Sequence, residues 1–472
     1  MSRFEPVIGL EVHVQLATRT KLFCGDPVEF GALPNSHVCP VCLGLPGALP
    51  VPNAAAVELA IRTALGLGCD VHETSVFARK NYFYPDLPKG YQITQFDRPL
   101  ATGGGLDPGA GHVRLRRIHI EEDAGKSIHD RFSARTAVDL NRAGTPLIEI
   151  VTEPDISSPA HARAFLVLLK QTLEYLDVSD CDMEKGSLRV DANVSVRPAG
   201  TLAPGTKTEV KNMNSFSSVE RALAFEIERQ TALREAGGRI EHETLLWDAN
   251  RSEARPMRSK EESHDYRYFP DPDLPPLVVE RKRIEEIASD LPELPASRRA
   301  RFREAYALPD YDAGVLTAAR EVADYFEKVA AAASDAKAAS NWVMTDVLGW
   351  LNQRGSPLVE LRVSPSALAE VIRMVRGGAL SSSMGREVFL EMAASGRDAA
   401  DVVRERGLVQ VRDEDQLRSW AEEAVRTNPV EAERYRGGEA KLMAFFMGQV
   451  MKKSKGQADP RQTTQLLREI LG

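Results

Sequence analysis

Acidic and imidazole side chains occur at strand-like positions in three parts of the first 200 residues. Glu11 and His13 are two residues apart in an alternating apolar run, so on a strand they share one face. Three consecutive acids, 121–123, directly follow another alternating run, and Asp191 lies within a third. Because like charges repel, a bound divalent cation would explain these placements, and carboxylate oxygens suit Mg²⁺ or Mn²⁺. An exposed strand face or a solvated turn is the alternative at each position.

The cysteines outline a second candidate metal site. Cys39 and Cys42 form a Cys-x-x-Cys pair, and Cys24 lies upstream of them. Two such pairs make a tetrahedral zinc site, but here the upstream half reads Cys24-Gly25-Asp26. Three thiols are therefore available, and Asp26, His37 or a water would be the fourth ligand. We predict a zinc site formed by Cys24, Cys39 and Cys42, with Asp26 as the first of the three candidates for the fourth ligand.

Basic residues that suit a nucleic acid or nucleotide occur in two settings. The segments 79–86 and 264–273 place basic residues beside aromatic ones, a combination that suits bases and phosphates, although packed loops would look the same. The last 39 residues, 434–472, hold eight basic against three acidic residues, a local charge of +5. This favours contact with a phosphate backbone, and a merely solvated C-terminal helix is the alternative.

Composition excludes several classes of protein. The 472 residues carry 60 Lys and Arg against 68 Asp and Glu, a net charge of −8, which excludes a uniformly basic nucleic-acid coat. We expect no secretory signal and no membrane span. The five cysteines are an odd number, three of them lie within the first 42 residues, and this favours a reducing cytosol over a disulfide framework, hence a cytoplasmic protein.

The segment 124–127 reads Ala-Gly-Lys-Ser, but Ile120 stands where a phosphate-binding loop needs its first glycine.

Two kinds of element must position these residues. Alternating runs predict strands over 7–14, 113–120 and 188–196, and they are interrupted by predicted helices over 54–67, 159–176 and 219–236. Beyond Pro292–Pro295 almost everything reads as helix. The predicted helices there cover 299–306, 313–334, 336–353, 365–376, 384–394, 399–405, 413–427, 430–435, 440–453 and 460–471.

We therefore predict an α+β fold in which a large mixed or antiparallel sheet is followed by two small all-α domains. The predicted boundaries are 1–293 for a catalytic domain, 294–406 for a helical domain and 407–472 for a helical tail domain.

Several motifs in the same order closely resemble the B subunit of the bacterial aspartyl/glutamyl-tRNA amidotransferases. The resemblance runs from about residue 4 to residue 471. The motifs that carry it are Ile8–His13, Arg79–Asp86, Glu121–Ser127, Val138–Ile150, Glu209–Phe216, Asp265–Pro270, Gly448–Lys452 and Lys455–Ala458.

The resemblance implies a heterotrimer with an amidase (A) subunit, which releases ammonia from glutamine, and a small C subunit. The B subunit would use ATP and Mg²⁺ to phosphorylate the side-chain carboxylate of Glu or Asp mis-attached to tRNA(Gln) or tRNA(Asn), and ammonia would then displace phosphate. A stand-alone ATP-using ligase and a non-enzymatic zinc-stapled RNA-binding scaffold are the alternatives.

The resemblance also assigns roles to single residues. It implies a catalytic set of Lys80, Glu122, Glu11 and His13, magnesium ligands Glu11, His13, Glu122 and Asp191, nucleotide contacts from Asn81, Tyr82, Asp191 and Lys211, and tRNA contacts from Lys452, Lys453 and Lys455. Zinc-bearing members resemble Cys-x-Cys where this chain reads Cys24-Gly25-Asp26, which leaves Asp26 as a chemically able fourth ligand. Some relatives lack the cysteines altogether, so the zinc site is expected to be structural rather than catalytic.

Overall fold

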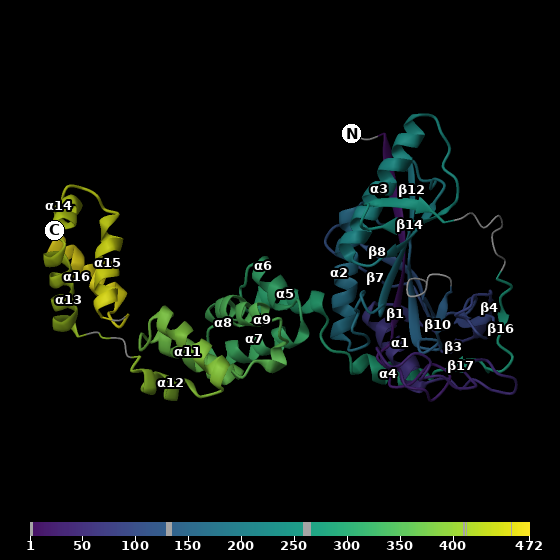
Figure 1. Cartoon of the computed structure of the whole chain (residues 1–472), viewed down its shortest axis with the longest axis horizontal. Helices are drawn as coiled ribbons and strands as arrows, with labels where there is room; N and C mark the ends of the chain where they lie inside the picture. Colours follow the sequence, from purple (N-terminus) through teal and green to yellow (C-terminus); the bar gives the residue numbers. More distant parts are fainter. Residues whose placement is uncertain (1–2, 129–134, 258–265, 409–410, 412, 455) are drawn as a thin grey trace. The chain divides into compact units, whose positions relative to one another are not determined.

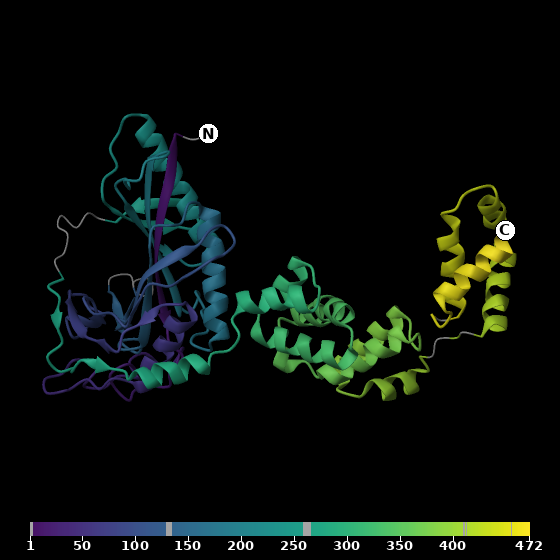
Figure 2. The same cartoon turned by 180° about the vertical axis from the view of Figure 1, so that it is seen from behind.

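A computed structural model describes residues 3–128, 135–257, 266–408, 411, 413–454 and 456–472. The chain divides into two compact units, Met1–Pro295 and Ala296–Gly472 (Figures 1 and 2). The first unit is built on a mixed sheet and the second is helical, which confirms the predicted fold class. No helix among the described residues is long and apolar enough to cross a bilayer.

A ten-stranded sheet forms the frame of the first unit, and its strands follow the order β15-β14-β13-β12-β1-β11-β8-β6-β2, with β7 paired to β8. Neighbouring strands are antiparallel except for β13 and β14. The bounds are β1 Phe4–Gln15, β2 Asp70–Val71, β6 Ala101–Thr102, β7 Gly105–Leu106, β8 Val113–Glu122, β11 Pro146–Thr152, β12 Leu188–Pro198, β13 Thr208–Met213, β14 Thr244–Asp248 and β15 Glu253–Pro256. The three strands predicted from alternation are confirmed as β1, β8 and β12.

Period-two alternation gives the central strands one apolar and one polar face. Leu10, Val12 and Val14 of β1 are buried, and they share a core with helices α1 (Ala54–Gly66), α2 (Pro159–Tyr175) and α3 (Phe216–Glu235). The helices begin at side-chain caps from Asn53, Ser158 and Ser215, which accept bonds from backbone N–H groups of the first turn. The alternate residues of β1 therefore lie on the face that these helices leave uncovered.

Three small sheets complete the first unit. One contains β16 (Phe269–Pro270), β4 (Phe77–Asn81) and β5 (Tyr91–Gln95), and β5 contacts the end of β8. The others pair β9 (Lys126–Ile128) with β10 (Ala137–Asp139), and β3 (Thr74–Ser75) with β17 (Leu277–Val278). Helix α4 (Arg281–Ser289), which was not among the predicted helices, packs beside α1.

The second unit holds two separate hydrophobic cores, one within residues 302–402 and one within 417–471. The predicted boundaries at 293 and 406 stay predictions. The helices are α5 Pro295–Ala305, α6 Asp310–Leu316, α7 Arg320–Ala333, α8 Ala336–Trp342, the π-helix η1 Val343–Val347, α9 Leu348–Arg354, the 3₁₀ helix η2 Leu358–Glu360, α10 Pro365–Arg376, α11 Ser382–Ser395, α12 Ala399–Arg406, α13 Glu414–Thr427, α14 Pro429–Arg436, α15 Leu442–Lys453 and α16 Pro460–Leu471.

The predicted single helix over 313–334 is wrong, because the chain leaves the helix after Leu316 and begins α7 at Arg320. The N–H of Thr317 closes the last turn on the carbonyl of Ala313, and the hydroxyl of Thr317 donates to the same carbonyl at 2.7 Å. No glycine or proline marks this break, so the usual stop signals do not reveal it.

Candidate active site

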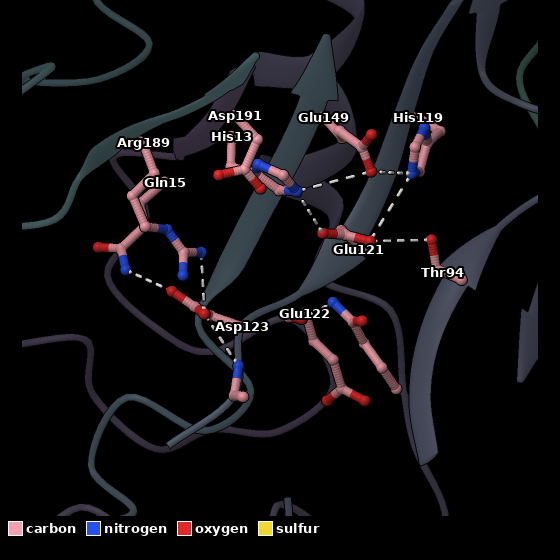
Figure 3. Close-up of polar contacts among 12 residues, drawn as sticks. His13, Gln15, Thr94, His119, Glu121, Glu122, Asp123, Glu149, Arg189 and Asp191 are labelled. Carbon is pink, nitrogen blue, oxygen red and sulfur yellow. Dashed lines mark hydrogen bonds and ion pairs between the residues drawn. The ribbon is translucent and has the colours of Figure 1, made fainter. Parts of the chain in front are cut away.

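A row of four charged or titratable side chains crosses the face of the large sheet that α1, α2 and α3 do not cover (Figure 3). His119 on β8 pairs in register with Glu149 on β11, Glu149 pairs with His13 on β1, and His13 pairs with Arg189 on β12. Residues opposite one another on antiparallel strands have side chains about 5 Å apart, so strand pairing alone brings these four together.

One group of candidate metal ligands combines two members of this row with the nearby Glu121 of β8. It consists of His13, Glu121 and Glu149, whose ligand atoms all lie within 4.8 Å of one another. The Nε2 atom of His13 is 3.7 Å from Oε1 of Glu121 and 3.6 Å from Oε2 of Glu149. Burial disfavours charge on both carboxylates, but hydrogen bonds from His119 hold their pKa values below the ordinary range. The two acids are therefore ionised and able to act as ligands.

A second group lies on neighbouring strands of the same face. It consists of Glu11 on β1, Asp191 on β12 and Glu209 on β13, and Glu11 pairs in register with Asp191. The Nζ atom of Lys211 lies 2.8 Å from Oδ2 of Asp191 and 3.0 Å from Oε1 of Glu209. Burial, together with the charges of Glu149 and Glu209, raises the pKa of Glu11. The three acids repel one another, and Lys211 offsets only part of their charge, so binding of a divalent cation would stabilise the ionised form of Glu11.

Both groups fit a hard divalent cation. Their donors are carboxylate oxygens with a single imidazole nitrogen, and Mg²⁺ and Mn²⁺ prefer such ligands to thiolates. The groups come from separate strands and converge on one sheet face, so the backbone frame positions them before any ligand is bound.

Lys80 on β4 adds a half-buried cation near the first group. Burial alone would lower the pKa of its ammonium, but the charges of Glu121 and Glu149 raise it. The ammonium lies 4.9 Å from the ring centre of Tyr266 and 5.8 Å from that of Tyr82. The predicted catalytic lysine is thus charged, lies beside two tyrosine rings and is close enough to Glu121 and Glu149 to feel their charge.

The structure does not bring Glu122 to either group, contrary to the predicted magnesium set. Consecutive strand residues point to opposite sides, so Glu121 faces His13 whereas Glu122 pairs with Lys89 and accepts the N–H of Ile93 at 2.9 Å. Sequence reasoning identified the acidic run, but within that run it is Glu121, and not Glu122, that lies with His13 and Glu149.

Two other ligand candidates were missed altogether. Glu149 lies within the apolar strand segment 146–152, and Glu209 within the more polar strand segment 208–213. A lone acid between apolar strand residues is the signal that was available for Glu149, whereas Glu209 stands between Thr208 and Val210 and carried no such signal. Confirming it requires the strand pairing, which joins Glu149 to His13 and Glu209 to Asn193.

The predicted nucleotide contacts Asn81 and Tyr82 bond to other parts of the protein. The side-chain amide of Asn81 donates to the carbonyl of Arg267 at 2.8 Å, and the hydroxyl of Tyr82 donates to Oε1 of Gln92 at 3.1 Å. Both residues therefore brace the segment around Tyr266 against β4 and β5, next to Lys80.

Asp123 ends the acidic run in a basic setting. Its carboxylate accepts bonds from Arg189 at 3.0 Å and from Gln15 at 2.7 Å, and Arg142 lies 3.6 Å away. Burial opposes its charge, but Arg189 and Arg142 lower its pKa. Asp123 therefore holds Arg189 at the edge of the row that contains His13.

The thiols predicted to bind zinc lie together with Asp26. Ligand atoms of Cys24, Asp26, Cys39 and Cys42 are all within 4.8 Å of one another, and the group does not include His37. The carboxylate of Asp26 accepts from the thiols of Cys24 at 3.6 Å and Cys42 at 3.3 Å. The neighbouring Cys24 lowers the pKa of Cys42 to about 6, which favours its thiolate. Three sulfurs and one carboxylate can bind a metal such as Zn²⁺ tetrahedrally.

The tail lysines divide into two cases. Lys452 and Lys453 form the last turn of α15, where Lys453 pairs with Glu423 and Lys452 is exposed. Lys455 lies outside the described residues.

The chain matches a family model described as the GatB/GatE catalytic domain over residues 6–285, the part that holds the acidic face. It matches a second, described as the GatB domain, over residues 324–471. The chain therefore belongs to the GatB family.

Individual relatives are similar over almost the whole chain. A protein of Carboxydothermus hydrogenoformans, named as the B subunit of an aspartyl/glutamyl-tRNA(Asn/Gln) amidotransferase, is 50% identical, covering 100% of this chain and 99% of the relative. A protein of the same name from Moorella thermoacetica is 51% identical, covering 99% of this chain and 100% of the relative.

Proposed function

We propose that this chain is the subunit of a tRNA-dependent amidotransferase that uses ATP to activate the side-chain carboxylate of Glu on tRNA(Gln) or of Asp on tRNA(Asn). The proposal rests on the sheet face that gathers two groups of candidate metal ligands. It is supported by similarity over almost the whole chain to proteins named as such subunits.

The chemistry requires activation because a carboxylate oxygen is a poor leaving group. A carboxylate oxygen of the substrate attacks the γ-phosphorus of ATP and ADP leaves, which forms a C–O–P bridge. Ammonia then adds to the carbonyl carbon, and phosphate departs with the former carboxylate oxygen. Such phosphoryl transfer depends on positioning and on neutralising charge rather than on a protein nucleophile.

The acidic groups would hold the metal in this reaction. His13, Glu121 and Glu149 are the proposed ligands of one Mg²⁺, and Glu11, Asp191 and Glu209 are those of a second. When bound, Mg²⁺ neutralises the charge of the triphosphate and of the transferring group.

The neighbouring basic side chains supply contacts for anions. The charges of Glu121 and Glu149 act on Lys80, and we infer that Lys80 binds the substrate carboxylate or the transferred phosphate. Lys211 lies between Asp191 and Glu209, and we infer that it contacts the nucleotide phosphates at the second group. Asn81 and Tyr82 would contribute to the nucleotide site mainly by bracing the wall beside Lys80.

Partner subunits would supply the ammonia that this reaction needs. The relatives are named as one subunit of an amidotransferase, which supports a complex, and we propose an amidase (A) subunit that releases ammonia from glutamine and a small C subunit. Free ammonia would be protonated in water and lose its nucleophilicity, so a shielded route between subunits is expected.

Two accessory features fit the same assignment. A zinc ion held by Cys24, Asp26, Cys39 and Cys42 would be structural, since these residues are not among those of the acidic face. Lys452, Lys453 and Lys455 would contact the tRNA backbone, whose phosphates attract a basic tail.

The test is to co-express the chain with an amidase and a small subunit and to supply tRNA(Gln) charged with Glu and tRNA(Asn) charged with Asp. We expect ADP formation that depends on the mischarged tRNA, and Gln-tRNA or Asn-tRNA formation that depends on ammonia or glutamine. Full glutamine-dependent activity of the chain alone would contradict the heterotrimer. Absence of ATP use by the complex would favour the alternative, a zinc-stapled RNA-binding scaffold.

A further inference from the structure

His119 lies behind the first acidic group, away from the proposed reaction. It is 3% exposed and stands on β8, in register with Glu149. Its Nε2 atom is 3.1 Å from Oε2 of Glu149 and 3.6 Å from Oε2 of Glu121, so one imidazole nitrogen contacts both carboxylates (Figure 3). A buried histidine in this position links the two acids that face His13.

The two oxygens of Glu121 have different surroundings. Oε1 faces Nε2 of His13 at 3.7 Å, whereas Oε2 lies toward His119 and accepts a bond from the hydroxyl of Thr94 at 3.1 Å. Thr94 is itself buried on β5, so its hydroxyl is fixed by the small sheet that contacts β8. One oxygen is therefore held from behind, and the other is left toward His13.

Contacts from His119 and Thr94 lower the cost of holding Glu121 and Glu149 close together. Two carboxylates so close together repel, and a free glutamate side chain loses rotamer entropy when it is fixed. A donor that lies against both carboxylates, at 3.1 Å from Glu149 and 3.6 Å from Glu121, offsets the repulsion, and it fixes their orientation when the protein folds rather than when an ion binds.

We propose that His119 and Thr94 are positioning residues that fix Glu121 and Glu149 with oxygens toward His13 and so preorganise this group for a divalent cation. His13 is the imidazole ligand, and His119 donates from behind without touching the ion. The inference rests on the proposed metal role of the group.

The test uses the full-length chain and Mn²⁺ as the probe. Electron spin-echo spectroscopy detects the ¹⁴N coupling of a coordinated imidazole, and this signal separates the His13 group from the all-carboxylate group of Glu11. We expect the coupling in the unaltered chain, its loss in His13→Gln and its retention in His119→Gln, whose amide nitrogen reaches about as far as Nε2 and can donate.

Affinity for Mn²⁺ at the ¹⁴N-coupled site is measured by titration. We expect about 10- to 100-fold weaker binding in His119→Ala and a smaller loss in Thr94→Val, with rescue in His119→Gln and Thr94→Ser. His161→Ala is the matched control, because His161 is also 3% exposed but bonds to Ser157 and the carbonyl of Gly111, away from the site. Its affinity should equal that of the unaltered chain.

Each other outcome has a distinct meaning. Loss of the ¹⁴N coupling in His119→Gln would make His119 a ligand and overturn the proposal. Unchanged affinity in His119→Ala and Thr94→Val, with the unaltered chain binding Mn²⁺, would overturn the positioning role alone. No coupled Mn²⁺ in the unaltered chain would overturn the proposed metal site together with this inference. Should His119→Ala not fold, Thr94→Val decides the matter.

Discussion

Glu121 and Glu122 are adjacent acids of nearly equal burial, and exchanging each for glutamine separates the two interpretations of the acidic run. Glu121 faces His13, whereas Glu122 faces Lys89. Coulomb's law gives about 4 kcal/mol for two unit charges about 4 Å apart at an effective dielectric of about 20, and twice that for a divalent ion. The amide oxygen of glutamine and a water recover part of this electrostatic attraction. Glu121→Gln should therefore weaken Mn²⁺ binding at least ~100-fold, which is ~2.7 kcal/mol of binding free energy.

Glu122→Gln should act on stability instead. The side chains of Lys89 and Glu122 are 8% and 3% exposed, and breaking a buried pair by neutralising one partner costs about 3–5 kcal/mol. Glutamine still offers an acceptor to the N–H of Ile93, so we expect the free energy of unfolding to fall by about 3 kcal/mol and Tm by about 6 °C. Thermal unfolding and Mn²⁺ titration of both variants measure these effects. A large loss of Mn²⁺ affinity in Glu122→Gln, with little change in Glu121→Gln, would refute the assignment of strand faces.

Three further predictions test other parts of the molecule. Cys39→Ser and Asp26→Ala should each lower the zinc content of purified protein from about one equivalent, measured by metal analysis, and equal zinc in Asp26→Ala would exclude Asp26 as a ligand. Asp123 has a lowered pKa, so its stabilisation is present above the ordinary aspartate pKa of about 3.9 and is lost as the pH falls below it. Unfolding free energy should therefore depend less steeply on pH below about 4 in Asp123→Asn than in the unaltered chain, and equal slopes would contradict this. Lys452→Ala should weaken tRNA binding and reduce the slope of log affinity against log salt by up to ~0.9, whereas Lys282→Ala, at an exposed lysine of α4, should not.

The parts of the site that sequence reasoning found are those that local periodicity determines. Glu11 and His13 share a face because residues two apart on any strand do, and Asp191 was found by the same rule. The helices with clear caps and glycine stops were also predictable, as α2 and α12 illustrate. Each of these features depends on a few neighbouring residues.

The remainder depends on contacts between distant segments. Glu149 joins His13 only because β11 pairs with β1 in one register, and a shift of one residue would turn it to the other face. The choice between Glu121 and Glu122 depends likewise on which face of β8 adjoins β1 through β11, and the role of Thr94 depends on where the small sheet packs. Alternation specifies two faces, but only strand pairing decides which face meets which partner.

The central claim is that the substrate carboxylate itself becomes phosphorylated, and an oxygen label tests it most directly. Glu labelled with ¹⁸O in its side-chain carboxylate is attached to tRNA(Gln) and converted by the complex with ATP and ammonia. We expect one ¹⁸O atom to move into the inorganic phosphate released with each Gln-tRNA, because the bridging oxygen leaves with phosphorus. Unlabelled phosphate accompanying efficient Gln-tRNA formation would contradict it.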